Sequence, residues 1–183
     1  MLGARDFVGY YDWTFRYLER EYGPDALEQY WREAIAFDAQ QHARRLFLEK
    51  GFDGMHDYWR RMLEMEEAGY AVSRSENHFR IDMFDCPSLG YLIEHGLHAY
   101  HDYCAHCIGW IGPLMKEAGF VVDHEHNHLG QCYFEMRCAD QGVNGREPPP
   151  VRGCTDVRNS AHWNQGIHHL YLQSRLVKRS VEE

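Results

Sequence analysis

Apolar residues recur at helical spacing through the first 69 residues, and this pattern predicts a run of helices. The first stripe, which includes Trp13 and Leu18, stops at Gly23-Pro24, a pair that breaks helices. A second helix is predicted from Pro24 to Lys50-Gly51, where a cation followed by glycine is a typical end. A third is predicted to begin at Asp53 and to end at Gly69. We interpret this part of the chain as a helical scaffold.

From Tyr70 onward the apolar period changes to two, which is typical of half-buried strands. Residues 71–74 and 79–83 alternate in this way, and the polar residues between them predict a hairpin. A second strand pair is predicted where residues 120–122 are followed by a turn at 128–130 and a returning strand at 131–138. One face of that last strand carries Cys132, Phe134, Met136 and Cys138.

Between the two strand pairs, Cys86-Pro87-Ser88 is a typical helix start, because proline tolerates the first helical turn. The helix is predicted to reach about Ala118, with a kink or a break at Pro113. After an extended connection, a last helix is predicted from about His168 to Val177. The fold class is therefore α+β, with N-terminal helices and a small antiparallel sheet packed against a long cysteine-bearing helix. We expect one domain, in which 1–69 is the helical scaffold, 70–140 the cysteine-bearing core, and 141–183 the extended connection with the C-terminal helix.

Composition narrows the classes of function. The chain has 183 residues, of which 44% are hydrophobic, enough for one compact core. A formal net charge of −9 argues against a nucleic-acid partner, since phosphates require a basic surface. No stretch approaches the roughly 20 apolar residues that cross a membrane, and the N-terminus lacks a secretory signal. We therefore expect a cytoplasmic protein whose six cysteines are reduced.

Projection of the long helix at 100° per residue places Cys104 in the middle of its apolar face, which would point the thiol toward the sheet. Cys86 and Cys132 could approach it from the strands, and His101 lies beside it on the helix. Such a group could supply a nucleophile and a base. A buried core cysteine without chemistry is the alternative interpretation.

Histidines raise a metal hypothesis. His95, His98, Asp102 and His106 form a stripe on the opposite helix face, where a solvated surface would give the same spacing. In an extended strand, His124, His126 and His128 would share one face, an arrangement that binds zinc or iron when a thiolate is nearby, although a polar hairpin end explains it too. The pair Cys104 and Cys107 has no second C-x-x-C for a zinc ribbon, and its place deep in the predicted helix argues against redox chemistry.

Several short motifs lie within residues 70–138: Cys86-Pro87 with Leu89-Gly90, the predicted helix with Cys104, Gly119-Phe120, and Gly130-Gln131-Cys132-Tyr133-Phe134. In these motifs the chain resembles the L-2-amino-thiazoline-4-carboxylic acid hydrolase family. The resemblance implies an α+β fold, hydrolysis of a cyclic C=N bond, and roles for Cys86, Cys104 and Cys132. This chain departs from the family after Cys104, where Cys104-Ala105-His106-Cys107 replaces Cys-x-x-Asp.

The leading functional hypothesis is a cysteine-based hydrolase acting on a C–N or C=N bond of a compact heterocyclic small molecule. Cys104 would attack the carbon, His101 or His106 would transfer the proton, and Cys107 is the remaining catalytic candidate. The pocket would be lined by Cys86, Cys132, Trp110 and Phe134. No cofactor is favoured in this hypothesis.

Two alternatives remain open. The first is a metalloprotein, enzyme or sensor, that holds zinc or iron through His124 and His126 with a thiolate, or through the helical histidine stripe. The second is a module that binds a small molecule without chemistry. The aromatic content and the C-terminal segment are compatible with a homodimer.

Overall fold

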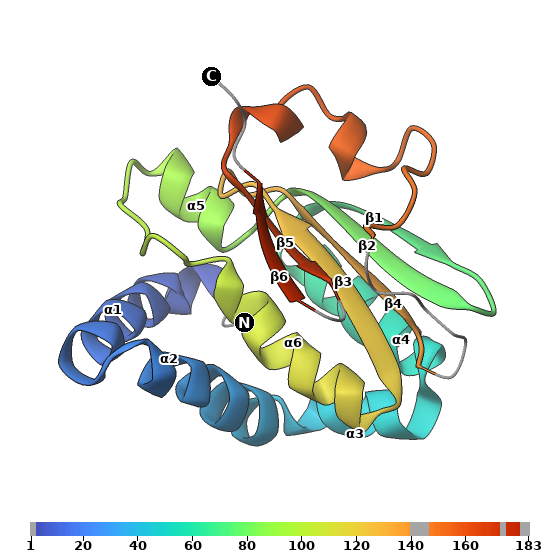
Figure 1. The fold of residues 1–183 in the computed structure, drawn as a ribbon, viewed down its shortest axis with the longest axis horizontal. Coiled ribbons are helices and arrows are strands. Elements are labelled where there is room, and N and C mark those ends of the chain that lie inside the picture. The colour runs from blue at the N-terminus through green and yellow to red at the C-terminus, as the bar shows by residue number, and fades with distance from the viewer. Residues whose placement is uncertain (1–2, 140–146, 173–174, 180–183) are drawn as a thin grey trace.

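A six-stranded antiparallel sheet forms the centre of the protein, with the strand order β1-β2-β4-β3-β5-β6 (Figure 1). The computed structural model describes residues 3–139, 147–172 and 175–179. Both predicted hairpins are present, because alternating apolar side chains place one face of each strand in the core. The strands are β1 (Gly69–Arg74), β2 (His78–Asp85), β3 (Phe120–His126), β4 (Cys132–Cys138), β5 (His168–Leu172) and β6 (Arg175–Arg179).

The N-terminal residues are helical, as predicted. The second predicted helix is three consecutive pieces, because a π-helical stretch lies in its middle. Gly51, with φ of 54°, ends α3 in the left-handed region that favours glycine. The helices are α1 (Ala4–Tyr22), α2 (Pro24–Tyr30), the π-helix η1 (Trp31–Ala39), α3 (Gln41–Lys50), α4 (Phe52–Met65), α5 (Leu89–Glu94) and α6 (Ala105–Glu117).

The helices cover one face of the sheet, and the main core lies between the two layers (Figure 1). Phe79 and Ile81 of β2 and Phe134 and Met136 of β4 are buried there. They pack against side chains of α3, α4 and α6 that include Phe47, Trp59, Leu114 and Met115. Helices and sheet therefore share one core, and the predicted α+β fold class is confirmed.

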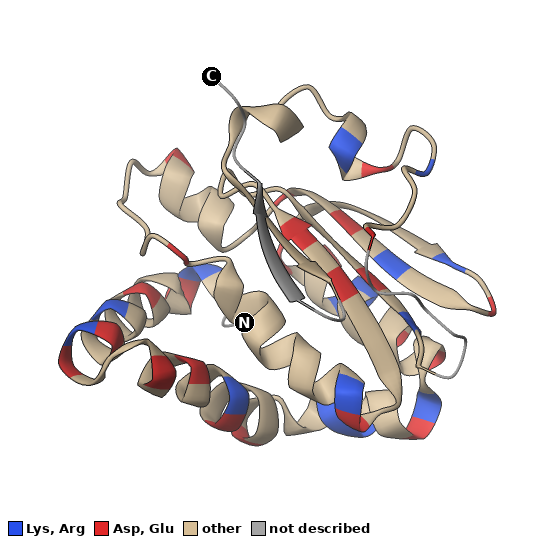
Figure 2. Ribbon diagram, viewed as in Figure 1, with Lys and Arg blue, Asp and Glu red and all other residues tan. Residues whose placement is uncertain are grey.

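The opposite face of the sheet is charged and is covered by residues 147–165, which contain the short 3-10 helices η2 (Val157–Asn159) and η3 (Trp163–Gln165). Figure 2 shows the acidic and basic positions on the strands beneath. Arg80, of which 1% is exposed, forms ion pairs with Asp82, Glu135 and Asp156 at 2.7–3.2 Å. Buried charges are stable only when they are paired in this way. The network thus fastens this segment to the sheet.

The prediction of one long cysteine-bearing helix is wrong. That helix is replaced by α5 and α6, and residues 95–104 between them are not helical. Gly96, which follows the end of α5, has a φ of 64°, the left-handed conformation in which helices often end. Pro113, where we expected the kink or break, lies inside the continuous α6. The helical projection that placed Cys104 mid-face and His101 beside it therefore does not apply.

The predicted C-terminal helix from His168 to Val177 is also wrong, since β5 and β6 form there. His124, Glu125 and His126 of β3 lie opposite Tyr171, Leu170 and His169 of β5. Pairing with the free edge of β3 satisfies the backbone of β5, and such tertiary pairing overrides a weak local preference. Within the described residues, no helix is long and apolar enough to cross a membrane.

Candidate metal centre

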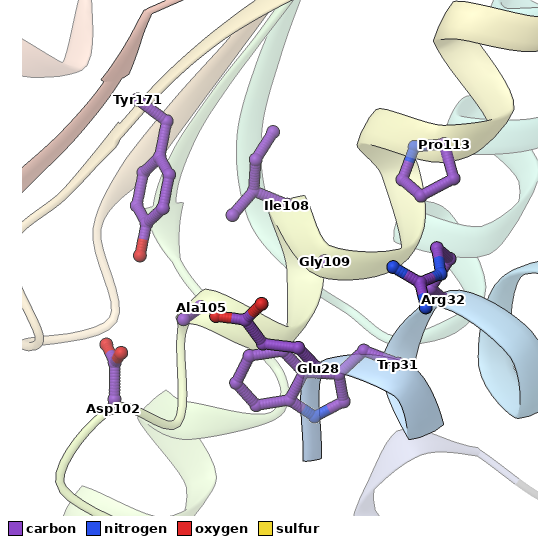
Figure 3. A pocket seen from close by; sticks show the side chains of 9 residues that line it. All are labelled: Glu28, Trp31, Arg32, Asp102, Ala105, Ile108, Gly109, Pro113 and Tyr171. Carbon is purple, nitrogen blue, oxygen red and sulfur yellow. The ribbon is translucent and has the colours of Figure 1, made fainter. Parts of the chain in front are cut away.

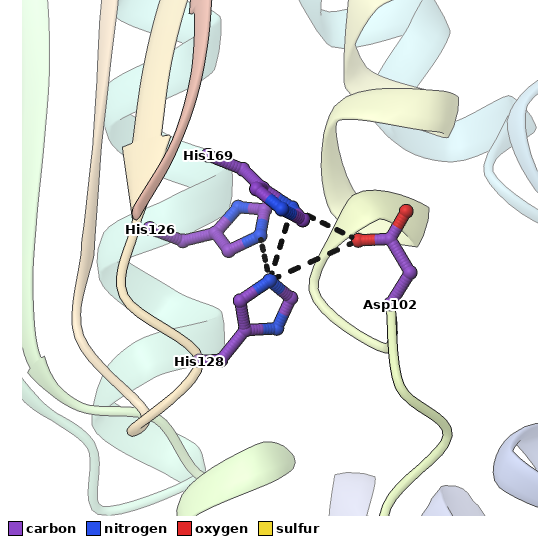
Figure 4. Close-up of side chains that lie close together, drawn as sticks. All are labelled: Asp102, His126, His128 and His169. Carbon is purple, nitrogen blue, oxygen red and sulfur yellow. Dashed lines mark hydrogen bonds and ion pairs between the residues drawn. The ribbon is translucent and has the colours of Figure 1, made fainter. Parts of the chain in front are cut away.

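Three imidazole rings and one carboxylate converge at one end of the sheet, on the face that the helices cover (Figure 4). Their ligand atoms all lie within 4.8 Å of one another. His128 Nε2 lies 3.2 Å from His126 Nε2 and 3.0 Å from His169 Nδ1. Asp102 Oδ1 lies 3.3 Å from His169 Nδ1 and 3.9 Å from His128 Nε2. We call this group the His3Asp centre.

Strand register brings two of these residues together. His126 on β3 and His169 on β5 are directly opposite partners in adjacent antiparallel strands. Their side chains therefore leave the sheet on the same face, about 5 Å apart at Cβ. Asp102 comes from the non-helical turn that precedes α6. The break in the predicted long helix is what allows this carboxylate to reach the sheet.

His128 follows β3 and has a φ of 56°, which is uncommon for a residue that has a Cβ. The side-chain oxygen of Asn127 accepts hydrogen bonds from the N–H groups of Leu129 and Gln131, at 2.9 and 3.3 Å. This Asx turn closes the loop and holds His128 in the left-handed region. The ring consequently turns back toward His126 and His169.

A hydrogen-bond chain determines which nitrogen of His126 faces the centre. His124 Nδ1 lies 2.7 Å from the carbonyl oxygen of Tyr133, which can only accept, so His124 Nδ1 carries the proton. In the neutral ring His124 Nε2 is then an acceptor, and it lies 2.9 Å from His126 Nδ1. His126 must donate from Nδ1, and its Nε2 lone pair points into the His3Asp centre. Metal-binding histidines are commonly oriented by such outer hydrogen bonds.

The environment keeps these rings neutral. Burial, together with the nearby His106 and His128, lowers the pKa of His124 to about 3 although its bond to Tyr133 acts in the other direction. Burial, followed by the neighbouring imidazoles His124 and His128, lowers the pKa of His126 well below its usual range. Neutral imidazole is the form that binds metal ions.

The spacing of the four ligand atoms fits a transition-metal ion. Zinc–nitrogen bonds of about 2.0–2.1 Å in a tetrahedron place neighbouring ligand atoms about 3.3 Å apart. Four of the six distances between these atoms span 3.0–3.9 Å, and the other two are at most 4.8 Å. Nitrogen and carboxylate donors suit zinc, and also iron, better than magnesium or calcium, which prefer oxygen ligands alone. The residues therefore fit one divalent transition-metal ion.

A cavity of about 340 Å³ opens next to this centre, and Asp102 belongs to both (Figure 3). Tyr171 also lines the cavity, and its ring centroid lies 5.8 Å from that of His126. Asp102 is the most exposed of the four ligand residues, with 32% of its side chain accessible. An ion in the centre would thus be approached from the cavity side. The remaining lining residues are Glu28, Trp31, Arg32, Ala105, Ile108, Gly109 and Pro113.

The predicted thiol centre is arranged differently from our expectation. Cys104 is the residue just before α6, so the C-x-x-C pair opens a helix, which corrects the prediction that it lies deep inside one. Burial, and then the neighbouring thiols Cys86 and Cys107, raises the pKa of Cys104. Burial, and then the neighbouring thiol of Cys86, likewise raises the pKa of Cys107 and the pKa of Cys132. These environments favour the protonated thiol over the reactive thiolate.

The candidate bases are also placed differently. His101 is largely exposed, and its Nε2 lies 3.7 Å from a carboxylate oxygen of Glu19 on α1. His106, predicted on the face away from the core, is buried, and its Nε2 lies 3.5 Å from Cys107 Sγ. Burial lowers the pKa of His106 to about 4. The contact therefore joins a neutral imidazole to a neutral thiol.

Of the predicted metal ligands, His126 lies in the centre and His124 lies directly behind it. Phe134, expected in the pocket wall, stacks on the His124 ring with centroids 4.0 Å apart. Trp110 packs in the core and is not part of the cavity wall. The histidine stripe does not form, because His95 ends α5 and the following residues are not helical.

Sequence reasoning missed His169. It placed Asp102 in a different candidate metal site, the helical histidine stripe, and noted His128 only as part of the histidine run. The alternation in His169-Leu170-Tyr171-Leu172 was the available signal for a strand with a histidine at its start. Comparisons of the chain with protein-family models, with curated proteins and with solved structures found no match. The resemblance to the thiazoline hydrolase family thus stays a prediction.

Proposed function

We propose that the protein is a metal-dependent enzyme that binds one divalent transition-metal ion, zinc in the first place, in the His3Asp centre and hydrolyses a small molecule. The observation that carries the proposal is the convergence of three imidazole nitrogens and one carboxylate oxygen within 4.8 Å. Zinc has no redox chemistry, and a bound zinc ion polarises a carbonyl group or activates water. Hydrolysis is therefore the reaction class that fits best.

Some of these residues would bind the metal ion, and one would lie where the substrate enters. His126, His128 and His169 would hold the ion, and His124 would keep the His126 ring in its orientation. Asp102 would complete the set at the cavity side, where a substrate can enter. A purely structural zinc site is usually closed by four protein ligands, whereas a catalytic site has three and leaves the fourth position to water or substrate. The three imidazoles would be the permanent ligands here, and Asp102, on the cavity side, would give up its position when water or substrate binds. The adjoining cavity favours catalysis.

Elemental analysis of untagged, purified protein tests the proposal. We expect about one equivalent of zinc or iron per chain. The variants His126→Ala and His169→Ala should each lose the metal, while His98→Ala, which changes an exposed histidine, should retain it. Wild-type protein that binds no transition metal after dialysis against zinc would refute the proposal.

One contact favours a second candidate, the cysteine-based hydrolase predicted from the sequence. His106 Nε2 lies 3.5 Å from Cys107 Sγ, and Cys104 lies one helical turn away. Its test is turnover by Cys104→Ser and Cys107→Ser proteins, together with alkylation rates of all six thiols at neutral pH. A functional thiolate should react far faster than the others. Uniformly slow alkylation of the thiols, together with active serine variants, would refute the cysteine-based hydrolase. The metal-dependent enzyme would then be the remaining proposal.

A further inference from the structure

The cavity beside the His3Asp centre has one charged side chain that the rest of the described protein does not neutralise. Glu28 lines the open side of this cavity, where it is exposed to solvent, and it has no hydrogen-bond or ion-pair partner among the described residues. Figure 3 shows its carboxylate pointing inward, between the rings of Trp31 and Tyr171. Arg32, the cation in the wall, has an exposed side chain and lies 3.6 Å from Glu33. The lining thus has two carboxylates, those of Glu28 and Asp102, against the one guanidinium of Arg32.

Two aromatic rings form opposite parts of the wall. Trp31 is held against α6 because residue 109 is glycine. A Cβ at that position would lie 2.8 Å from Trp31 Cε3, closer than real contacts allow. Tyr171 lines the other part of the wall, and a tyrosine side chain is a neutral phenol at pH 7. The faces of neutral aromatic rings attract organic cations.

Helix α6, which forms another part of the cavity wall, adds a backbone hydrogen-bond acceptor. Pro113 has no N–H group, so the carbonyl of Gly109 lacks the donor that a helix normally provides four residues later. Both residues line the cavity. A ligand with N–H donors would find an acceptor here in addition to the two carboxylates.

We propose that this cavity binds a small organic ammonium group, held by the Glu28 carboxylate between Trp31 and Tyr171. The substrate of the enzyme would then be a compact amine whose reacting group faces Asp102 and the metal ion. This identification of the substrate class rests on the proposed function, whereas binding of the cation itself needs no metal. The net charge of −9 would also draw cations toward the protein.

Calorimetric titration with three ligands of similar shape tests the inference: benzylammonium, benzyl alcohol and benzoate. Full-length protein would be used both after EDTA treatment and after loading with zinc. In the metal-free protein, benzylammonium should bind at least about ten times more tightly than either of the others, the usual effect of a charge-assisted hydrogen bond. Glu28→Gln should remove most of that preference.

Asp38→Asn provides the matched control, because it removes one negative charge from an exposed position in the same helical run. It should leave benzylammonium affinity within about twofold of wild type. Equal binding of the three ligands, tighter binding of benzoate, or no binding of benzylammonium at millimolar concentrations would overturn the inference. Protein that selects benzylammonium but takes up no zinc would refute the proposed function alone.

Discussion

At the scale of single residues, the protons of the buried histidines decide what the His3Asp centre can do. The Tyr133 carbonyl, His124 and His126 form a chain in which each donor and acceptor is assigned by its neighbour. His124 does not touch the centre, yet it orients the ring that does. Its contribution can be separated from that of the ligands by measuring metal affinity.

We expect His124→Gln to weaken zinc binding about 10–100-fold, the usual cost of losing an outer hydrogen bond to a metal-binding histidine. The glutamine side chain has about the right size but cannot hold the ring of His126 in the same way. Competition with a chromophoric zinc chelator would measure the dissociation constant. The His98→Ala control should match wild type, and an unchanged constant for His124→Gln would contradict the assigned chain.

His128 allows a test of backbone strain at the same site. Its φ of 56° costs about 1–2 kcal/mol for a residue with a Cβ, and glycine avoids this cost. In the presence of EDTA, His128→Gly should therefore unfold at higher urea concentration than His128→Ala, by about 1 kcal/mol in unfolding free energy. Both variants should lose zinc. Equal stability of the two variants would mean that the turn is not strained.

At the scale of elements, the charged face of the sheet depends on residues 147–165 being in place. Asp156 accepts hydrogen bonds from the N–H of Arg152, at 2.9 Å, and from the side chain of Arg158, at 2.7 Å. The guanidinium groups of Arg80 and Arg158 lie 4.1 and 4.8 Å from the ring centre of Tyr133. Removal of one charge from such a network leaves an uncompensated opposite charge among the buried groups.

Asp156→Asn should therefore lower the unfolding free energy by about 3 kcal/mol, measured by urea denaturation. Limited proteolysis should show faster cleavage between residues 147 and 165. Asp25→Asn, an exposed substitution in α2, is the control and should change stability by less than about 0.5 kcal/mol. A small effect of Asp156→Asn would show that this segment is not held by the network.

The Asp156 carboxyl group also predicts how the stability of the protein changes with pH in the acid range. Burial alone would raise the pKa of Asp156, but the hydrogen bonds from Arg158 and Arg152 and the charge of Arg80 lower it to about 2. A lowered folded-state pKa adds stability above the unfolded value near 3.8 and loses it as the pH falls from there toward 2. Unfolding curves between pH 5 and pH 2 should show wild type losing more stability than Asp156→Asn over this range.

At the scale of the whole molecule, the His3Asp centre joins parts of the chain that are far apart in sequence. Asp102 belongs to the turn before α6, His126 and His128 to the β3 end, and His169 to β5. An ion bound here would hold the helical layer to the sheet. It would also fix β5, which pairs with β3 and carries β6 on its other side.

Metal removal should therefore change global stability. A ligand at one hundred times its dissociation constant stabilises the folded state by about 2.7 kcal/mol. We expect zinc to raise the melting temperature of wild-type protein relative to the EDTA-treated form, and to have no effect on His126→Ala, measured by scanning calorimetry. Equal shifts in both proteins would place the stabilising ion elsewhere.

The hydrophobic pattern alone predicted the N-terminal helices, both hairpins and the α+β class, because the periods of 3.6 and 2 are properties of neighbouring residues. It also indicated that His124 and His126 share one strand face. By contrast, the predicted helix through Cys104 was wrong, since nothing in its apolar spacing reveals that residues 95–104 leave the helix. Similarly, a short segment such as 168–172 has no preference strong enough to resist pairing with β3.

The sequence by itself determined which segments are helical or extended over most of the chain, and which residue types are available for metal binding. Only the tertiary structure decided that Asp102, His128 and His169 meet His126. Strand register aligns His126 with His169, a left-handed turn redirects His128, and the path of the chain before α6 brings in Asp102. These are relations between residues up to 67 positions apart, and local periodicity carries no information about them.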